Sequence, residues 1–282
     1  MNNFWTRTLT GTVFVIVMIG CIWWSFWSMA GLFLVISILG LWEFYSLLEK
    51  ANYYPQKYIG IIICVALNAY FLWLVLDTIF SALLLSYMFW LFIPVSMLIF
   101  FIELFRNKQF PLKNISFTFL GLLYISIPFL FLSSLAIKSN VDFKHLQEIF
   151  TPYIILGFFL LTWSNDTFAY LVGIAIGKHK LFERISPKKT WEGFIGGIVL
   201  TQGIAYIISL YFTELTMIQW MIVALIVSVF GTMGDLVESM FKRSLGVKDS
   251  GNILPGHGGI LDRFDAVLLS SPFVVAYLML VR

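Results

Sequence analysis

Nine hydrophobic stretches follow one another along the chain, separated by shorter polar segments. Each is long enough for a helix of about 20 residues, the length that crosses the hydrocarbon core of a membrane. We expect these helices over residues 9–25, 27–47, 58–76, 83–104, 115–137, 153–176, 194–212, 217–238 and 260–281. No small-residue cleavage site follows the first stretch, so we interpret it as a span and not as a signal peptide. The pattern predicts an all-α, polytopic integral membrane protein.

Positive charges sort unevenly between the two sides that nine crossings create. Fifteen of the 18 Lys and Arg residues fall on the side of the N-terminus and of the loops after even-numbered spans. The other three are Lys138, Lys144 and Arg282. Because cytoplasmic loops are enriched in Lys and Arg, this distribution predicts a cytoplasmic N-terminus.

Composition supports the membrane interpretation. Hydrophobic residues make up 60% of the 282 positions and charged residues 12%, about half the charged fraction of an average soluble domain. A chain of this length cannot bury so many apolar stretches in one soluble globule. Cys21 and Cys64 lie inside apolar stretches and are interpreted as packing residues. The three histidines share no metal-ligand spacing.

The chain divides into an N-terminal membrane region of five helices (residues 1–137) and a C-terminal candidate catalytic region of four helices with cytoplasmic loops (residues 138–282). In the first region, Glu43 and Glu103 are interpreted as interfacial acids that pair with Lys50 and Arg106. The second region holds most of the acids near hydrocarbon and the two most basic loops. Such acids are costly and usually serve ions, protons or phosphate chemistry, so we expect function there.

A polar notch interrupts the stretch at 153–176. Asn165 and Asp166 fall near its middle. A hydrogen bond between helices would explain the asparagine. An aspartate needs more compensation than that, so Asp166 is a candidate functional residue.

The loop at 177–193 carries five Lys or Arg residues. Residues 186–190 resemble a helix start, where backbone N–H groups could join side chains in a phosphate cradle. The candidate side chains are Ser186, Lys188, Lys189 and Thr190. The alternative is a topogenic loop that contacts anionic lipid headgroups. The segment 173–178 lacks the spacing and the hydroxyl of a P-loop, which excludes a Walker-type site.

The tightest acidic cluster begins in the stretch at 217–238. Gly231 and Gly234 are expected to loosen the end of this helix just before Asp235. Asp235, Glu238 and Ser239 share one helix face, and Lys242 and Arg243 follow one turn later.

A glycine-rich segment then leads into the last span. Its backbone can approach a phosphate closely because glycine adds no side chain. His257 within it could be a general base, a hydrogen-bond donor to phosphate or a turn residue. The candidates from this segment and the following helix turn are Lys248, Asp249, His257, Gly258, Gly259, Asp262, Arg263 and Asp265.

Carboxylates from two helix ends, placed beside basic residues, suit one or two hard cations, most plausibly Mg²⁺. Two metals can hold the attacking and leaving oxygens of a phosphoryl or nucleotidyl transfer. The alternative is a buried network in which Lys242, Arg243 and Arg263 only pair with the aspartates.

The spacing of residues 239–265 resembles the signature of the phosphatidate cytidylyltransferase (CDP-diacylglycerol synthase) family. The matching positions are Ser239, Lys242, Arg243, Lys248, Asp249, Gly251, Pro255, His257, Gly258, Gly259, Asp262, Arg263 and Asp265. Residues 166–173, 177–178 and 186–193 also resemble the family, and the matches cover about the C-terminal 45% of the chain. Phe168 and Ile174 depart from it, since members often carry a small residue and an arginine there.

The resemblance implies that CTP and phosphatidate react to give CDP-diacylglycerol and pyrophosphate in phospholipid biosynthesis, and that the reaction needs Mg²⁺. The attacking phosphate is already anionic, so no strong general base is needed, and catalysis would rest on positioning and charge neutralisation. It implies Asp235 and Asp262 as metal ligands, with Asp265 and Asp249 as weaker candidates. The catalytic set is Asp235, Asp262, Lys242 and Arg263. The substrate-binding set is Asp166, Ser186, Lys188, Lys189, Thr190, Ser239, Arg243, Lys248, Asp249, His257, Gly258 and Gly259.

The expected partners are CTP, phosphatidate and membrane lipids, with no nucleic acid. A bacterial cytoplasmic membrane with the active site on its cytoplasmic side fits these substrates. The spacing of Gly193 and Gly197 permits close packing within the chain or in a homodimer.

Two other functions stay open. A CTP-dependent lipid kinase would release CDP instead of pyrophosphate. A cation- or proton-coupled transporter would use the same acids without nucleotide, although no internal repeat supports it. A CDP-alcohol phosphotransferase is excluded because its Asp-rich motif is missing.

Overall fold

The computed structural model describes residues 3–76, 94, 96–137, 150–247, 250–251, 253 and 258–281. Residues 96–106 are helical, and they cover part of the expected span at 83–104, whose remainder lies outside the described residues. The other elements are α1 (Asn3–Trp24), α2 (Phe26–Lys50), α3 (Lys57–Leu76), α5 (Pro111–Gly121), the π-helix η1 (Leu122–Ser126), α6 (Ile127–Ser134), α8 (Tyr153–Ile176), β1 (Lys180–Phe182), β2 (Ser186–Thr190), α9 (Trp191–Tyr211), α10 (Met217–Ser244) and α11 (Leu261–Val281).

Six of the described helical segments are long and apolar enough to cross a membrane: Phe26–Lys50, Pro111–Ser134, Tyr153–Ile176, Trp191–Tyr211, Met217–Ser244 and Leu261–Val281. Thr8–Trp24 and Lys57–Trp73 are shorter apolar helices. Many large hydrophobic side chains on these helices are exposed on the protein surface, as expected where lipid would contact them. The chain is therefore a predominantly helical integral membrane protein.

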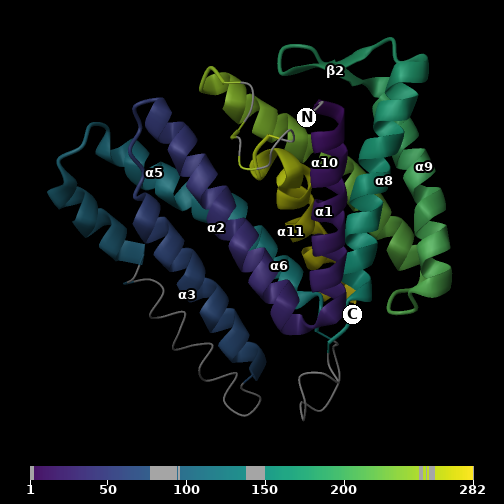
Figure 1. Ribbon diagram of the computed structural model, residues 1–282, viewed down its shortest axis with the longest axis horizontal. Coiled ribbons are helices and arrows are strands. Elements are labelled where there is room, and N and C mark those ends of the chain that lie inside the picture. The colour runs from purple at the N-terminus through teal and green to yellow at the C-terminus, as the bar shows by residue number, and fades with distance from the viewer. Residues whose placement is uncertain are drawn as a thin grey trace.

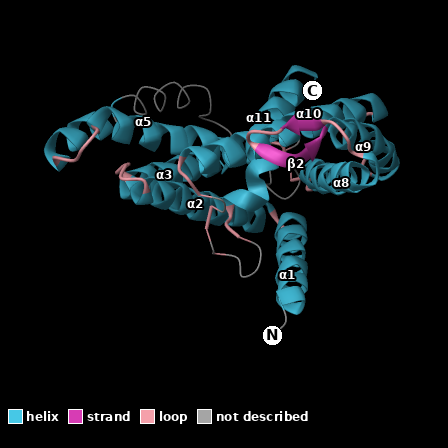
Figure 2. Cartoon of the chain, turned by 90° about the horizontal axis from the view of Figure 1, so that it is seen from above, coloured by secondary structure: helices cyan, strands magenta, loops and turns pink. Residues whose placement is uncertain are grey.

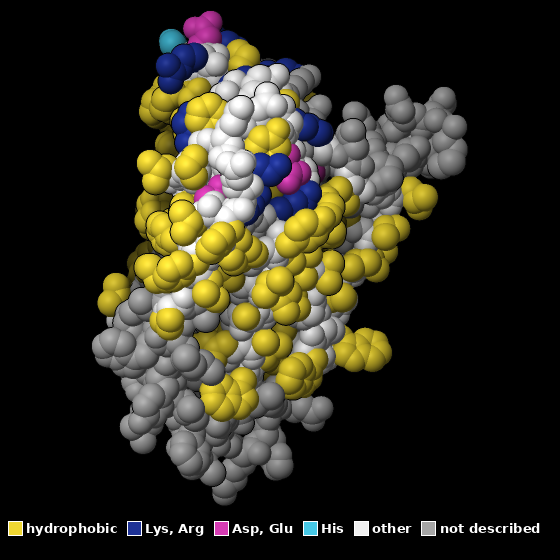
Figure 3. Space-filling view, turned by 90° about the vertical axis from the view of Figure 1, so that its left-hand side faces the viewer, with side chains coloured by type: hydrophobic (Ala, Val, Ile, Leu, Met, Phe, Trp, Pro, Cys, Tyr) yellow, Lys and Arg dark blue, Asp and Glu magenta, His cyan; other side chains and the backbone are white. Residues whose placement is uncertain are grey.

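The helices run up and down in one bundle (Figure 1), with the N-terminus and the β1–β2 hairpin toward one end and the C-terminus at the other. We call the first the hairpin end. Seen along the helices, α8, α9, α10 and α11 gather beneath the hairpin, whereas α2, α3 and α5 lie to one side (Figure 2). Charged side chains collect near one end of the surface in Figure 3, and hydrophobic side chains cover most of the rest of its described part.

Local sequence explains where several helices begin. Ser25 and Ser28 form a capping box at the start of α2, and Thr216 and Gln219 form one at the start of α10. Thr190 caps α9 by accepting a hydrogen bond from the Gly193 N–H at 3.2 Å.

The expected helix start at residues 186–190 is wrong. These residues form strand β2, which pairs antiparallel with β1, and α9 begins at Trp191. In a sheet of two strands, each strand pairs along one side only and leaves its other side as an edge. Pro187, which has no backbone N–H to donate, is tolerated on such an edge strand. The small hairpin is the exception to the all-α expectation within the described chain.

One hydrophobic core joins the two regions that the sequence suggested. The ring of Phe129 on α6 lies 5.6 Å from that of Phe33 on α2 and 5.3 Å from that of Phe264 on α11. All three side chains are almost completely buried. Helix α11, which carries Asp262 and Asp265, is therefore packed directly against the N-terminal helices.

Trp220 on α10 occupies a second tightly packed position. Its side chain is fully buried, and its indole N–H donates to the Phe212 carbonyl at 3.0 Å. The ring lies so close to Gly157 on α8 that a β-carbon added there would overlap it. Gly157 thus lets α8 and α10 approach each other.

We expect Gly157→Ala to lower the free energy of unfolding by about 1–3 kcal/mol, because the added methyl group overpacks a site that is already full. The midpoint of thermal unfolding in detergent measures this change. Gly203→Ala on α9 is the matched control, since a β-carbon there has nothing within 4 Å. Equal midpoints for the two variants would contradict the packing argument.

Candidate active site

A cavity of about 700 Å³ opens among α8, the hairpin, α9, α10 and α11. This volume lies within the range of small-molecule sites. The polar side chains that line it include four aspartates from α8, α10 and α11, three lysines from the hairpin, one asparagine and two threonines. They are Asn165, Asp166, Lys180, Lys188, Lys189, Thr190, Thr232, Asp235, Asp262 and Asp265.

Small residues bring α8 and α9 together beside this cavity. A β-carbon at Gly193 would come within 2.7 Å of the Ala169 carbonyl oxygen, and one at Gly197 within 3.0 Å of the Asn165 side-chain oxygen. A β-carbon at Gly177 would lie 2.7 Å from the Thr190 hydroxyl. Gly193 and Gly197 therefore serve packing within the chain, and the homodimer stays a prediction.

The backbones of α10 and α11 come into contact at Gly234. A β-carbon there would overlap the Asp265 carbonyl oxygen. The expectation that Gly231 and Gly234 loosen the helix is wrong, because α10 continues unbroken through Ser244. These glycines instead let the two helices approach closely and bring their acids together.

Three carboxylates meet where these helices touch. Asp235, Glu238 and Asp265 each offer an oxygen atom, and the three atoms lie within 4.8 Å of one another. Glu238 is 3% exposed, and its Oε1 has no hydrogen-bond partner among the described residues. Carboxylate oxygens alone suit a hard divalent cation such as Mg²⁺, so this set could hold one.

Two lysines partly neutralise the acids. Lys189 Nζ from the hairpin lies 2.5 Å from Asp235 Oδ2. Lys242 Nζ bridges α10 and α11, at 2.6 Å from both Glu238 Oε2 and Asp262 Oδ1. Breaking such a bridge leaves carboxylates without a partner in a half-buried site, which is costly.

Asp262 has a different environment from the other acids. Its Oδ1 accepts from Lys242, while its Oδ2 accepts from the Ser250 N–H, the Ser250 hydroxyl and the Gly259 N–H at 3.2, 2.9 and 2.8 Å. The structure thus regroups the acids: Asp265 joins Asp235 and Glu238, and Asp262 binds Lys242, Ser250 and Gly259. The metal-ligand role of Asp262 stays a prediction.

The other predicted residues lie around this centre. Ser239 donates to Asp235 Oδ1 at 3.2 Å. The Arg243 and Arg263 side chains are exposed at the hairpin end, and Gly258 adopts a left-handed backbone with φ of 84°. Ser186 lies at the start of β2. The candidates Lys248, Asp249 and His257 lie outside the described residues.

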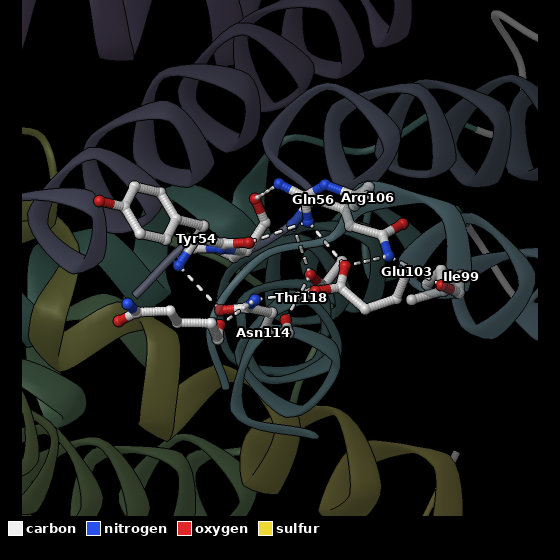
Figure 4. A network of polar contacts seen from close by, with 9 residues as sticks. Tyr54, Gln56, Ile99, Glu103, Arg106, Asn114 and Thr118 are labelled. Carbon is white, nitrogen blue, oxygen red and sulfur yellow. Dashed lines mark hydrogen bonds and ion pairs between the residues drawn. The ribbon is translucent and has the colours of Figure 1, made fainter. Parts of the chain in front are cut away.

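The pairing of Glu103 with Arg106 is confirmed, at 2.7 Å. Figure 4 shows that Glu103 also accepts from Gln56 and Asn114, at 2.9 and 2.8 Å. These contacts join residues 96–106 to the turn before α3 and to α5. They form a structural network outside the cavity.

The interpretation of Glu43 is wrong. It does not pair with Lys50 but lies buried at 4% exposure and accepts from the Leu261 N–H at 2.9 Å. Its position in an apolar stretch was the only sequence signal, and that signal does not identify a partner 218 residues away.

Two further residues escaped the sequence analysis. Lys180 on β1 lines the cavity. Tyr124 lies in the π-helix η1, a rare element that often marks functional sites. Its hydroxyl is buried and has no hydrogen-bond partner among the described residues.

Comparison with known proteins matches the chain to one family and to bacterial relatives. The profile of the family described as "Cytidylyltransferase family" matches residues 5–281. The chain is 42% identical over 184 residues to a phosphatidate cytidylyltransferase of Staphylococcus aureus (strain COL), which covers 64% of this chain and 66% of the relative. It is 43% identical over 175 residues to a phosphatidate cytidylyltransferase of Bacillus subtilis (strain 168), covering 62% of each. The matched segments thus span less than two thirds of either relative's length.

We expect Lys242→Met to lower the free energy of unfolding by about 3–5 kcal/mol, because it leaves both Glu238 and Asp262 without their shared cation. Thermal unfolding in detergent measures the change. Lys178→Met, at an exposed position before the hairpin, is the control and should leave the midpoint unchanged. Two similar midpoints would show that the bridge does not stabilise the contact between α10 and α11.

Proposed function

Because the chain belongs to the cytidylyltransferase family, we propose that it transfers CMP from CTP to phosphatidate, giving CDP-diacylglycerol and pyrophosphate. The observation that carries this proposal is the cavity, where carboxylates for a cation and lysines for phosphates line one space within the membrane helices. The names of the bacterial relatives support the same reaction.

In this reaction, an anionic phosphate oxygen of phosphatidate attacks the α-phosphorus of CTP. The bond from that phosphorus to the oxygen bridging to the β-phosphate breaks, and pyrophosphate leaves with both electrons. The attacking oxygen is already charged, so the site needs no strong general base. Positioning and charge neutralisation supply the catalysis.

The hairpin is the proposed phosphate-binding element. Lys188 and Lys189 lie on β2, and Lys180 lies on β1 across from the end of β2. Ile174, where family members often carry arginine, also lines the cavity. Lys180, which lines the same cavity from β1, is proposed to supply the positive charge that this arginine provides in other members. Arg243 and Arg263 add positive charge at the hairpin end.

Asp235, Glu238 and Asp265 are the proposed Mg²⁺ ligands. Their oxygens fit a hard cation by chemistry and spacing, and Glu238 Oε1 has no other partner among the described residues. Bound there, Mg²⁺ would neutralise charge on the triphosphate. The chain's own residues orient this set: the Ser239 hydroxyl holds Asp235, and Lys242 holds Glu238 against Asp262.

The proposed topology has nine crossings, with the N-terminus and the cavity facing the cytoplasm of a bacterial cell. The sorting of Lys and Arg supports it. The opposite positions of the two termini in Figure 1 suit an odd number of crossings. CTP would then enter from the cytosol, while phosphatidate would arrive through the membrane.

Purified protein given CTP, phosphatidate and Mg²⁺ should release one pyrophosphate for each CDP-diacylglycerol formed. Pyrophosphate and lipid products are measured together, with a metal-free reaction as control. Release of CDP with a phosphorylated lipid would instead identify a lipid kinase. Cation flux into sealed vesicles without nucleotide would support a transporter.

Substitution of a metal ligand should lower the activity by more than the roughly 10–100-fold loss that is typical when a residue supporting a ligand is replaced. We expect Asp235→Asn, Glu238→Gln and Asp265→Asn each to raise the Mg²⁺ concentration needed for half-maximal activity. Steady-state assays over a Mg²⁺ series measure this. Glu183→Gln, an exposed acid in the turn of the hairpin, is the control.

The same series distinguishes two roles for Asp262. If Asp262 acts through Lys242, Asp262→Asn lowers kcat and leaves the Mg²⁺ requirement unchanged. If it is a ligand, its Mg²⁺ requirement rises as much as that of Asp265→Asn. A normal Mg²⁺ requirement in all three cluster variants would refute the ligand set.

A further inference from the structure

A carboxylate from the N-terminal half of the chain reaches the start of α11. Glu43 lies on α2, and its Oε2 accepts a hydrogen bond of 2.9 Å from the N–H of Leu261, the first residue of α11. The first N–H groups of a helix have no partner within the helix, and the helix dipole favours negative charge there. Glu43 satisfies one of these groups from a helix 218 residues earlier in the sequence.

Two glycines before α11, Gly251 and Gly259, also pack closely against this carboxylate. A β-carbon added to Gly251 would overlap Glu43 Oε1, and its three nearest atoms would all belong to Glu43. A β-carbon added to Gly259 would overlap Glu43 Oε1 and the Ser250 hydroxyl. Gly251 does not have a positive φ, so the space taken by Glu43, and not the backbone conformation, calls for glycine there.

These contacts lie next to the acids of the cavity. Asp262 follows Leu261 directly, and Asp265 lies one helical turn further on. Gly259, which donates to Asp262, also packs on Glu43, and Ser250, the other donor, directly precedes Gly251. Glu43 itself is buried and is not among the residues that line the cavity.

We propose that Glu43 is a positioning residue, which holds Gly251, Gly259 and the start of α11 so that Asp262 and Asp265 meet Lys242 and Asp235. The role rests on the proposed function of the cavity. It also gives the N-terminal helices a part in the site, because α2 supplies the anchor for a helix of the C-terminal region.

The first test compares Glu43→Ala, Glu43→Gln and the control Glu49→Gln. Glu49 lies on the same helix, but 40% of its side chain is exposed and it pairs with Lys57 at 3.6 Å. We expect Glu43→Ala to lower kcat by about 10–100-fold, as losses of supporting partners do. Its Mg²⁺ requirement should rise, while its KM for CTP changes little. Glu43→Gln keeps an acceptor for the Leu261 N–H and should retain more activity than Glu43→Ala.

The second test does not depend on activity. Hydrogen exchange of peptides covering residues 250–265 should be faster in Glu43→Ala than in the wild type or in Glu49→Gln. Exchange in α9 serves as the internal reference. Unchanged exchange at 250–265 would overturn the anchoring contact.

A double-mutant cycle separates positioning from general stability. Gly251→Ala should lower kcat and the unfolding midpoint in the wild type, because its methyl group displaces the Glu43 carboxylate. In the Glu43→Ala background that space is free, so the same substitution should have a smaller effect. Additive effects, or a Glu43→Ala protein with wild-type kcat, would overturn the proposal. If the wild type releases no pyrophosphate, the proposed function fails, whereas exchange and unfolding still test the role of Glu43.

Discussion

The contact between the backbones of α10 and α11 at Gly234 is the constraint on which the site depends. It brings Asp235 and Glu238 from one helix within reach of Asp265 from the other. A larger residue at Gly234 would push the two helices apart, and the three carboxylates would no longer lie within 4.8 Å of one another. The geometry of the acids is therefore a consequence of helix packing.

Charge balance limits how many acids such a contact can hold. Lys242 joins the two helices through Glu238 and Asp262, and Lys189 reaches Asp235 from the hairpin. Since the acids come from membrane helices, each lysine reduces the cost of keeping negative charge away from water. The hairpin thus contributes to the site in two ways, by lining the cavity and by neutralising its acids.

The N-terminal helices complete the arrangement from the other side. Glu43 holds the start of α11, and Phe129 packs between Phe33 and Phe264. The two regions share one core and one set of polar contacts, so the cavity is built by the whole bundle even though its lining comes from the C-terminal region.

The sequence by itself determined the membrane class, most helix ranges and the acidic and basic candidates, because hydrophobic length and local spacing are properties of neighbouring residues. For the same reason, it grouped the acids by helix, with Asp235 and Glu238 at the end of one helix and Asp262 and Asp265 at the start of another. Only the tertiary structure decided that Asp265 joins the α10 acids, that Asp262 holds Lys242, that residues 186–190 form a strand and that Glu43 anchors α11. Each of these depends on contacts between segments far apart in the chain, which local periodicity does not encode.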